Sequence, residues 1–443
     1  MKITWLDPRE LLVHELQQQT EEGNEVSSLR QRWEVLQSTC HDEEELRRHA
    51  LKLLDEISHS ALQNFDSEPS GLTEIAPLLS SSSRALPKLS FSEKELYDRI
   101  LGGWLGRAAG CLLGKPVEKH SRAVIRELLE SNRTWPLSDY ITARDIPQEL
   151  LQKYPWNRHD GRESLKENIV CMPEDDDLNY SMLNLHVLEK FGPDFTTENI
   201  AECWLSMLPV LSTFTAERVA YLNLLNGMRP PQTATFRNPY REWIGAQIRA
   251  DLWGWAAPGN PERAAQWAWR DARLSHVRNG IYGEMFFAAA IAAAFVSSNV
   301  QEIIAQGLQQ IPEHSSLADA VRFALMLPQK ERTWEGAVDR LYEKFGHYHW
   351  VHTMNNAALV VTALVYDEGD YERSICNVAM GGWDTDSNGA TAGSILGTMH
   401  GAKRLPEKWI SPLRNRMRSS LKGFDNSTFD DLAQRTLKQL VSF

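Results

Sequence analysis

Apolar residues in the main part of the chain recur every three or four positions, the spacing of a helix with one buried face. In "LNYSMLNLHVLEKFG", Leu178, Met182 and Leu185 follow this spacing, and Gly192 ends the segment as a helix C-terminal glycine. "FSEKELYDRILGGWLGRAAGCLLG" and "NPERAAQWAWRDARLSH" have the same character. Long alternating segments are absent after residue 92, so the pattern predicts an all-α main domain.

The first 90 residues are also helical in pattern, but they end in a different composition. "PRELLVHELQQQTEEG" closes at Gly23, and "DEEELRRHALKLLDEISH" carries acids in its first turn, where they complement the positive end of a helix. "SEPSGLTEIAPLLSSSSRALPKLS" is rich in Ser and Pro and indicates a linker. We therefore predict a helical N-terminal extension and linker over residues 1–90, docked on the main domain or on a partner, and the main domain over residues 91–443.

One long apolar segment, "IYGEMFFAAAIAAAFV" at residues 281–296, is too short to cross a bilayer and contains Glu284. It predicts a buried helix. The hydrophobic fraction of 42% is ordinary for a soluble globular protein. The formal charge of −12, with no run of Lys or Arg, argues against a surface that coats nucleic acid. We expect neither nucleic acid nor a membrane as a partner, and the oligomeric state stays open.

The five cysteines lie far apart and form no CxxC pair, which favours reduced thiols over a disulfide framework. The first residues, "MKITWLDPREL", lack the basic and apolar regions of a signal peptide. Together these features predict a cytoplasmic protein.

The segment "MPEDDDLNYS" places four consecutive acids, residues 174–177, just before a helix. One or two of them suit a helix N-cap. Four crowd like charges into one turn, and their repulsion raises the carboxyl pKa values unless a cation is bound. This segment alone leaves capping and metal binding open.

The segment "MGGWDTDSNGATAGSILG" places Asp384 and Asp386 before a run of Gly and Ala residues. Small residues let such a helix pack deep in the domain, and buried carboxylates need partners. A cap formed by Asp386 or Ser387 is the simpler alternative. Taken together, two acidic helix starts facing a small-residue core predict a site for two hard cations such as Mg²⁺, Mn²⁺ or Ca²⁺.

In "GRAAGCLLGKPVE", the glycines at 106, 110 and 114 form a smooth helical edge that allows another backbone to approach closely. A nucleotide-binding P-loop is excluded, because the glycine spacing is one residue short and Pro116 stands where a Ser or Thr is required. Glu118, beside Pro116 at the helix end, is the residue of this segment with chemical interest.

The segment "DARLSHVRNGIYGE" places His276 after a helix and before a Gly-rich turn. A capping or core role is one interpretation of this histidine. The other is a substrate-facing role, with Gly280 and Tyr282 in an exposed loop beside it.

Four segments, in this order along the chain, resemble the motifs of the ADP-ribosylglycohydrolase family: "GCLLGKPVE", "EDDD", "DARLSHVRNGIYGE" and "GGWDTDS". The resemblance covers about residues 92–440 and implies an all-α domain around a binuclear site with two Mg²⁺ ions, or Mn²⁺. It implies as metal ligands Glu174, Asp175, Asp176, Asp384, Asp386 and Ser387. It implies as catalytic carboxylates Glu118, Asp175 and Asp176, and places near the substrate His276, Gly280 and Tyr282.

Three positions depart from the family's motifs. Cys111 stands where the first motif has an Asp, and Glu174 stands where the metal motif has a Thr. A shift of register by one residue would bring in Asp177 for Glu174. Trp383 is inserted beside the second acidic motif, where we expect it to bind substrate by shaping the pocket.

The resemblance implies a metal-dependent hydrolase that cleaves the bond at C1 of a ribose, in an ADP-ribosylated protein or metabolite. One alternative is a hydrolase of a smaller, nucleoside-like ribosylated metabolite. Another is a non-catalytic protein that binds ADP-ribose or has a structural role.

Overall fold

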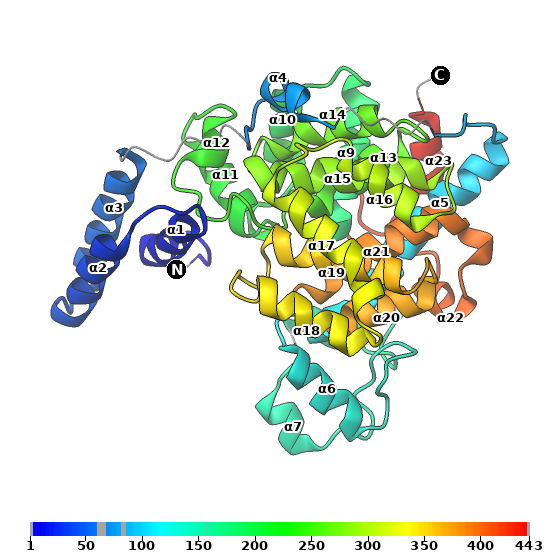
Figure 1. The fold of residues 1–443 in the computed structure, drawn as a ribbon, viewed down its shortest axis with the longest axis horizontal. Helices are drawn as coiled ribbons and strands as arrows, with labels where there is room; N and C mark the ends of the chain where they lie inside the picture. Colours follow the sequence, from blue (N-terminus) through cyan, green and yellow to red (C-terminus); the bar gives the residue numbers. More distant parts are fainter. Residues whose placement is uncertain (1–2, 60–67, 81–85, 157, 441–443) are drawn as a thin grey trace.

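The computed structural model describes residues 3–59, 68–80, 86–156 and 158–440, and these fold into helices joined by short loops (Figure 1). Among these residues no strand occurs, only isolated β-bridges such as Met172 with Met417. The prediction of an all-α fold is therefore confirmed. None of the described helices is both long and apolar enough to cross a membrane.

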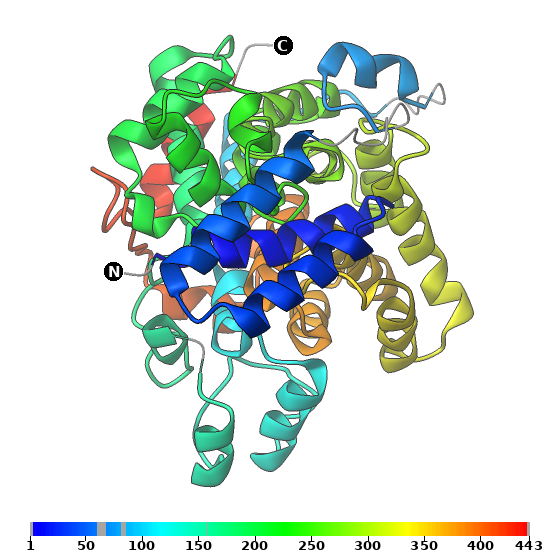
Figure 2. The ribbon, with the colours of Figure 1, turned by 90° about the vertical axis from the view of Figure 1, so that its left-hand side faces the viewer.

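The N-terminal extension contains three helices that lie beside the main body. They are at the left of the body in Figure 1 and in front of it in Figure 2. Two of them were predicted, and α2 joins these two. Residues 60–67, at the start of the predicted linker and just before it, and residues 81–85 within it lie outside the described part; the rest contains one short α-helix followed by a 3₁₀ turn. The bounds are α1 (Pro8–Glu21), α2 (Ser27–Thr39), α3 (Glu43–His59) and α4 (Leu72–Ile75).

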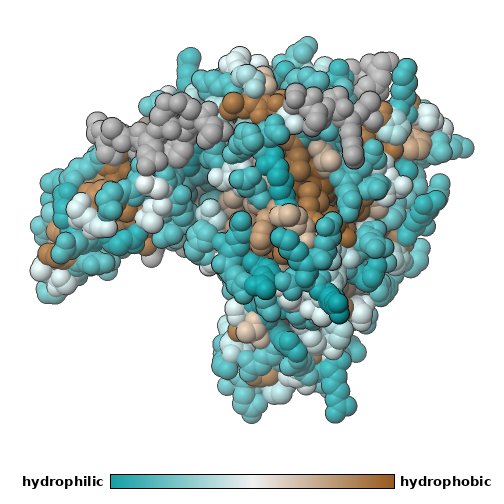
Figure 3. All heavy atoms as spheres, viewed as in Figure 1, coloured by the Kyte–Doolittle hydropathy of each residue, from teal (hydrophilic) through white to brown (hydrophobic). Residues whose placement is uncertain are grey.

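The main body is a bundle of helices from which α6 and α7 project (Figures 1 and 2). In the space-filling view, the outline is hollowed between this projection and the N-terminal helices (Figure 3). The helices that precede the long apolar segment are α5 (Glu93–Gly114), α6 (Arg122–Ser131), α7 (Gln148–Lys153), α8 (Arg158–Glu163), α9 (Asp176–Phe191), α10 (Thr197–Met207), α11 (Thr215–Leu225), α12 (Gln232–Thr235), α13 (Asp251–Trp255) and α14 (Pro261–Ala272). The remaining helices are α15 (Arg278–Ala294), α16 (Val300–Leu308), α17 (Ser316–Lys330), α18 (Trp334–Phe345), α19 (Thr353–Tyr366), α20 (Tyr371–Gly381), α21 (Thr385–His400), α22 (Glu407–Ile410) and α23 (Phe429–Lys438).

Helices α5 and α21 lie side by side and antiparallel at the centre of the body, with their backbones in direct contact. A Cβ on Gly106 would lie 2.2 Å from the carbonyl oxygen of Gly393. A Cβ on Gly110 would lie 1.9 Å from the carbonyl oxygen of Gly389. The predicted smooth edge is therefore confirmed, and its partner is the small-residue helix that follows Asp384 and Asp386.

Helix α15 is the predicted buried helix, and every one of its residues is buried. It begins at Arg278, so Gly280 and Tyr282 lie in its first turns. The expectation of an exposed loop there was wrong. The reason is close packing: a Cβ on Gly280 would lie 2.6 Å from the carbonyl oxygen of Arg241, which leaves no room for a loop open to solvent.

Candidate active site

Three chain segments that carry the candidate residues meet at one end of the paired helices α5 and α21 and line a cavity together with other parts of the chain. They are the 3₁₀ turn Lys115–Val117 after α5, the start of α9 and the start of α21. The space between these segments totals about 820 Å³, and this volume includes space that is open to solvent. Its acidic and hydroxyl lining comprises Glu118, Glu174, Asp175, Asp176, Asp177, Thr215, Glu217, Asp384, Asp386 and Ser387.

The start of α21 is held in place by hydrogen bonds to two other helices. The Asp384 backbone N–H donates to Asn356 Oδ1 over 3.2 Å, and Thr385 Oγ1 donates to the carbonyl oxygen of Gly114 over 2.8 Å. Gly382, with φ of 81°, supplies the left-handed turn that leads from α20 into this start. The loop thus fixes both aspartates against the end of α5.

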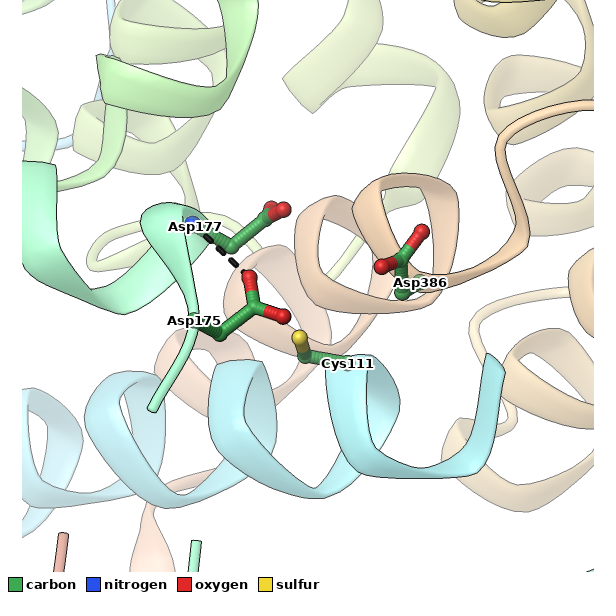
Figure 4. A group of neighbouring side chains, drawn as sticks. All are labelled: Cys111, Asp175, Asp177 and Asp386. Atoms are coloured by element: carbon green, nitrogen blue, oxygen red, sulfur yellow. Dashed lines mark hydrogen bonds between the residues drawn. The ribbon is translucent and has the colours of Figure 1, made fainter. Parts of the chain in front are cut away.

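Asp386 joins a group of four possible metal ligands contributed by three helices (Figure 4). The others are Cys111 of α5 and Asp175 and Asp177 at the start of α9, with their ligand atoms all within 4.8 Å of one another. The Asp177 backbone N–H donates to Asp175 Oδ1 over 2.9 Å, drawn as the dashed line in Figure 4. Ser387 Oγ donates to Asp177 Oδ2 over 3.2 Å and links the two acidic segments.

A second group consists of Glu118, Asp384 and Asp386, again with ligand atoms within 4.8 Å of one another. It offers carboxylate oxygens only, the ligands that Mg²⁺ prefers. Asp386 belongs to both groups, so the two overlap at one carboxylate.

The buried carboxylates repel one another strongly. Burial, together with the neighbouring carboxylate of Asp386, raises the pKa of Asp384 well above its ordinary value. Burial and the carboxylate of Asp175 likewise raise the pKa of Asp386. A divalent cation would relieve this repulsion, because an opposite charge favours the ionised form of both groups.

The two groups differ in the cations that the chain itself supplies. Lys115 Nζ forms an ion pair with Asp175, and Arg107 Nη2 lies 3.0 Å from Asp177 Oδ1. Against the effect of burial, Asp175 holds the pKa of Lys115 above its ordinary range. In the second group, Lys119 Nζ lies 3.9 Å from Glu118 Oε1. Among the residues that the structure describes, no Lys, Arg or His forms an ion pair with the other two members, Asp384 and Asp386.

The donor chemistry of the two groups leads to the same distinction. Burial raises the pKa of the Cys111 thiol. The thiol therefore keeps its proton at neutral pH and is a poor ligand for a hard cation. The all-oxygen group of Glu118, Asp384 and Asp386 therefore fits Mg²⁺ better than the group that contains Cys111.

Replacing Lys115 by Met is expected to strengthen divalent-cation binding by about tenfold or more, because it removes the ammonium group that occupies Asp175 and repels a cation. Unit charges 4 Å apart interact by roughly 4 kcal/mol at an effective dielectric constant near 20. Calorimetric titration with Mn²⁺ measures the change. Lys190→Met removes an exposed lysine that pairs with Glu202 on the surface and serves as the control. Equal Mn²⁺ affinity and stoichiometry in Lys115→Met and wild type would contradict this role of Lys115.

Glu217 lines the cavity and belongs to a buried charge network that the sequence did not indicate. Arg249 Nη1 lies 2.8 Å from Glu217 Oε1, and the same guanidinium also pairs with Asp271 at 3.2 Å and Glu284 at 3.6 Å. Three carboxylates thus surround one cation. Burial raises the pKa of Glu217 to about 7, although Arg249 opposes this shift.

The protein is expected to lose stability as the pH rises from 5 to 8, in part through Glu217. Its pKa in the folded state, about 7, lies above the ordinary value of 4.5, so the folded state binds the proton more tightly than the unfolded state. This contribution is complete below pH 4.5 and is lost as the pH rises through 7. We expect a loss on the order of 1–3 kcal/mol and a flatter profile in Glu217→Gln, whose amide stays neutral. Melting temperatures across this pH range test the expectation, and parallel profiles for the two proteins would exclude it.

The structure settles where each residue of the predicted metal motif lies. Asp175 and Asp177 point into the group with Cys111, while Glu174 Oε1 accepts a hydrogen bond from Asn179 Nδ2 at 2.8 Å. Glu174 and Asp176 line the cavity but belong to neither ligand group among the described residues. This geometry favours the shifted register, with Asp177 in place of Glu174.

His276, Gly280 and Tyr282 do not line this cavity. His276 is 1% exposed, and its Nδ1 lies 2.8 Å from Ser275 Oγ and 3.9 Å from Glu217 Oε1. The Tyr282 hydroxyl donates to the carbonyl oxygen of Pro69. In this structure His276 and Tyr282 are buried, and their contacts are those of core residues.

Trp383 is also absent from the cavity lining. Its ring stacks on Tyr342 with centroids 4.3 Å apart and an interplanar angle of 17°. The backbone φ of Trp383 is 60°, a conformation that L residues adopt at a cost, and the stacking holds it there. The inserted tryptophan packs between α18 and the start of α21 and supports the loop that carries Asp384.

The fold and the site define an all-α protein whose central cavity is lined by carboxylates from the ends of several helices. The chain belongs to the ADP-ribosylglycohydrolase family, whose model matches residues 92–441. A protein of Archaeoglobus fulgidus, described as an uncharacterized protein, is 24% identical over 318 residues, which cover 70% of this chain and 90% of that protein. A solved structure titled "ADP-ribosylglycohydrolase-related protein complex" aligns with a TM-score of 0.45 and 17% identity, over 79% of this chain and all of that one.

Proposed function

We propose that the protein is a divalent-cation-dependent hydrolase that cleaves the glycosidic bond at C1 of a ribose in an ADP-ribosyl compound. One observation carries the proposal: Glu118, Asp384 and Asp386 converge in a cavity of the family domain with their ligand atoms within 4.8 Å of one another. Membership of the ADP-ribosylglycohydrolase family supports the reaction type.

The carboxylates of the cavity hold the cation and assist the reaction in this proposal, and Glu118 contributes to both tasks. When bound at Glu118, Asp384 and Asp386, Mg²⁺ or Mn²⁺ supplies a positive centre that orients ribose hydroxyls and a water molecule. The Glu118 side chain is 13% exposed, so it can accept a proton from water at the cavity rim. Asp175 and Asp176 line the same cavity, and their negative charge favours the oxocarbenium-like transition state of glycosidic cleavage.

The expected second cation is proposed for the other ligand group, with weaker binding. A cation there competes with Lys115 for Asp175 and with Arg107 for Asp177. Two sites of unequal affinity follow from this competition. We place the reaction in the cytoplasm, where the cysteines, none of them disulfide-bonded in the described part, stay reduced.

A smaller ribosylated metabolite is the second candidate substrate, and the charge of the cavity favours it. Among the described residues of the lining, Lys115 and Lys119 are the only cations, and Lys115 already pairs with Asp175. A pyrophosphate would meet few positive partners in this cavity. A nucleoside-like compound avoids that difficulty.

The experiment is a panel of ribosylated compounds incubated with the protein and Mg²⁺: N- and O-linked ADP-ribosyl compounds, an ADP-ribosylated protein and ribonucleosides. Chromatography detects released ADP-ribose, ribose or base. We expect one class to be cleaved by wild type and not by Glu118→Gln, which keeps the size of the side chain and removes its charge. Absence of cleavage of every class, in protein shown to bind Mg²⁺, would favour the non-catalytic alternative.

A further inference from the structure

The N-terminal extension reaches the cavity through Trp5. Trp5 lines the same cavity as Asp384 and Asp386, although it lies far outside residues 92–441, which the family model matches. Figure 2 shows α1 crossing in front of the main body. One residue of the cavity wall therefore comes from outside the part of the chain that the family model matches.

Buried ion pairs fix the extension to the body. Arg241 pairs with Glu15 and with Glu22 of the extension, each at 2.8 Å. Arg278 of α15 pairs with Glu22 at 3.0 Å. Each of these side chains is 9% exposed or less, so the extension is docked by contacts that would be costly to break.

The residues next to Trp5 are tied to the cavity wall as well. Arg218 Nη1 donates to the carbonyl oxygen and to Oγ1 of Thr4, each over 3.1 Å. Arg218 follows Glu217 in α11, whose first residue, Thr215, lines the cavity. Arg218 of α11, a helix that contributes to the cavity lining, thus holds the residue next to Trp5 in place.

Trp5 itself is held in an unfavourable backbone conformation, with φ of 67°. Such strain persists only where surrounding contacts over-determine the residue, and it is concentrated at functional sites. Its aromatic neighbours Tyr240 and Trp243 are nearly perpendicular to it, at 85° and 83° with centroids 5.6 and 6.1 Å away. Within the described part of the chain no ring stacks face to face on Trp5, in contrast to Trp383 on Tyr342.

The cavity combines this indole with two further aromatic side chains, Phe214 and Trp350. Carboxylates dominate its polar lining and cations are few, so charge pairing offers little to the part of a ligand beyond its ribose. Aromatic side chains, by contrast, stack on any planar heteroaromatic ring.

We propose that Trp5 is a specificity-determining residue that stacks on a planar heteroaromatic ring of the ribosyl substrate. The inference rests on the proposed function and names its substrate class: ribosyl compounds that carry a purine-like ring. The ring has two possible sources, the group attached at C1 of the ribose or the adenine at the far end of ADP-ribose.

The test measures equilibrium binding by calorimetry in the presence of Mg²⁺, with three probes. Adenosine carries its ring at C1, ADP-ribose carries it at the far end, and ribose 5-phosphate has none. Trp5→Ala is expected to weaken binding of adenosine or ADP-ribose by about tenfold and to leave ribose 5-phosphate unchanged. Trp5→Phe, which keeps an aromatic face, is expected to retain binding within about threefold.

A matched control and a separate activity assay distinguish the possible failures. Trp156→Ala removes a half-buried tryptophan outside the cavity lining and is expected to change no affinity. Unchanged ring binding in Trp5→Ala, or equal weakening of all three probes, overturns the role of Trp5 while wild-type cleavage of the substrate panel still stands. If wild type neither binds the probes nor cleaves the panel, the proposed function fails and the inference fails with it.

Discussion

Replacing both Asp384 and Asp386 by Asn is expected to abolish Mg²⁺ binding and to lower the rate of ribosyl cleavage by at least about a thousandfold, equivalent to roughly 4 kcal/mol. Asn keeps the size of each side chain and removes the charge that attracts the cation. Calorimetry with Mg²⁺ and the rate of product release measure the two effects.

The same double variant is expected to gain stability in the absence of metal, although it loses Mg²⁺ binding and activity. In metal-free wild type, burial and mutual repulsion raise the pKa values of Asp384 and Asp386, and these charges oppose folding at neutral pH. The metal-free variant should therefore melt at a higher temperature than metal-free wild type, and Mg²⁺ should stabilise only wild type.

A matched control separates the site from a general effect of removing a buried carboxylate. Asp367 is also buried, 3% exposed, but lies outside the cavity lining. Asp367→Asn is expected to keep Mg²⁺ binding and activity. Retention of both properties in the Asp384 and Asp386 double variant would contradict the assignment of the metal site.

Replacing Gly110 by Ala is expected to cause the largest loss of stability of any Gly→Ala change at the glycines that the structure describes, about 3 kcal/mol or more. The new Cβ would lie 1.9 Å from the carbonyl oxygen of Gly389, and backbone cannot move aside as a flexible side chain can. The loss is expected although Ala favours a helix over Gly by about 1 kcal/mol. Thermal unfolding of the two proteins measures the difference.

Gly161 of α8 supplies the control for this substitution. A Cβ on Gly161 would lie 3.6 Å from its nearest neighbour, Pro116 Cα, which is ordinary van der Waals contact. Gly161→Ala should leave the melting temperature unchanged or raise it slightly. A Gly110→Ala protein as stable as Gly161→Ala would show that α5 and α21 do not pack as described.

The central helices could be predicted because local sequence determines them. Helical spacing of apolar residues located α9, and the four-residue glycine repeat of α5 implied a close backbone partner. The structure shows that this partner is α21, whose own glycines follow Asp386. Local pattern failed at Arg278, where "VRNGIYGE" looks like a turn. Tertiary packing of Gly280 against Arg241 overrides that preference.

The candidate site was only partly predictable, because some of its residues stand in local motifs and others are brought together by the fold. Asp175, Asp384 and Asp386 stand in acidic motifs, so their residue types alone indicated possible metal ligands. Lys115, Glu217 and Trp5 line the cavity through contacts between distant segments, and no spacing in the sequence marks such contacts. His276 has the chemistry of a site residue, but its neighbours bury it in the core.

The most direct test of the account is the dependence of ribosyl cleavage on a divalent cation. The protein is treated with a chelator, dialysed, and assayed on its best substrate while Mg²⁺ or Mn²⁺ is added back. The account predicts that cleavage is lost on chelation and returns as the Glu118, Asp384 and Asp386 group fills. Full activity in the chelated protein, with no response to either cation, would contradict it.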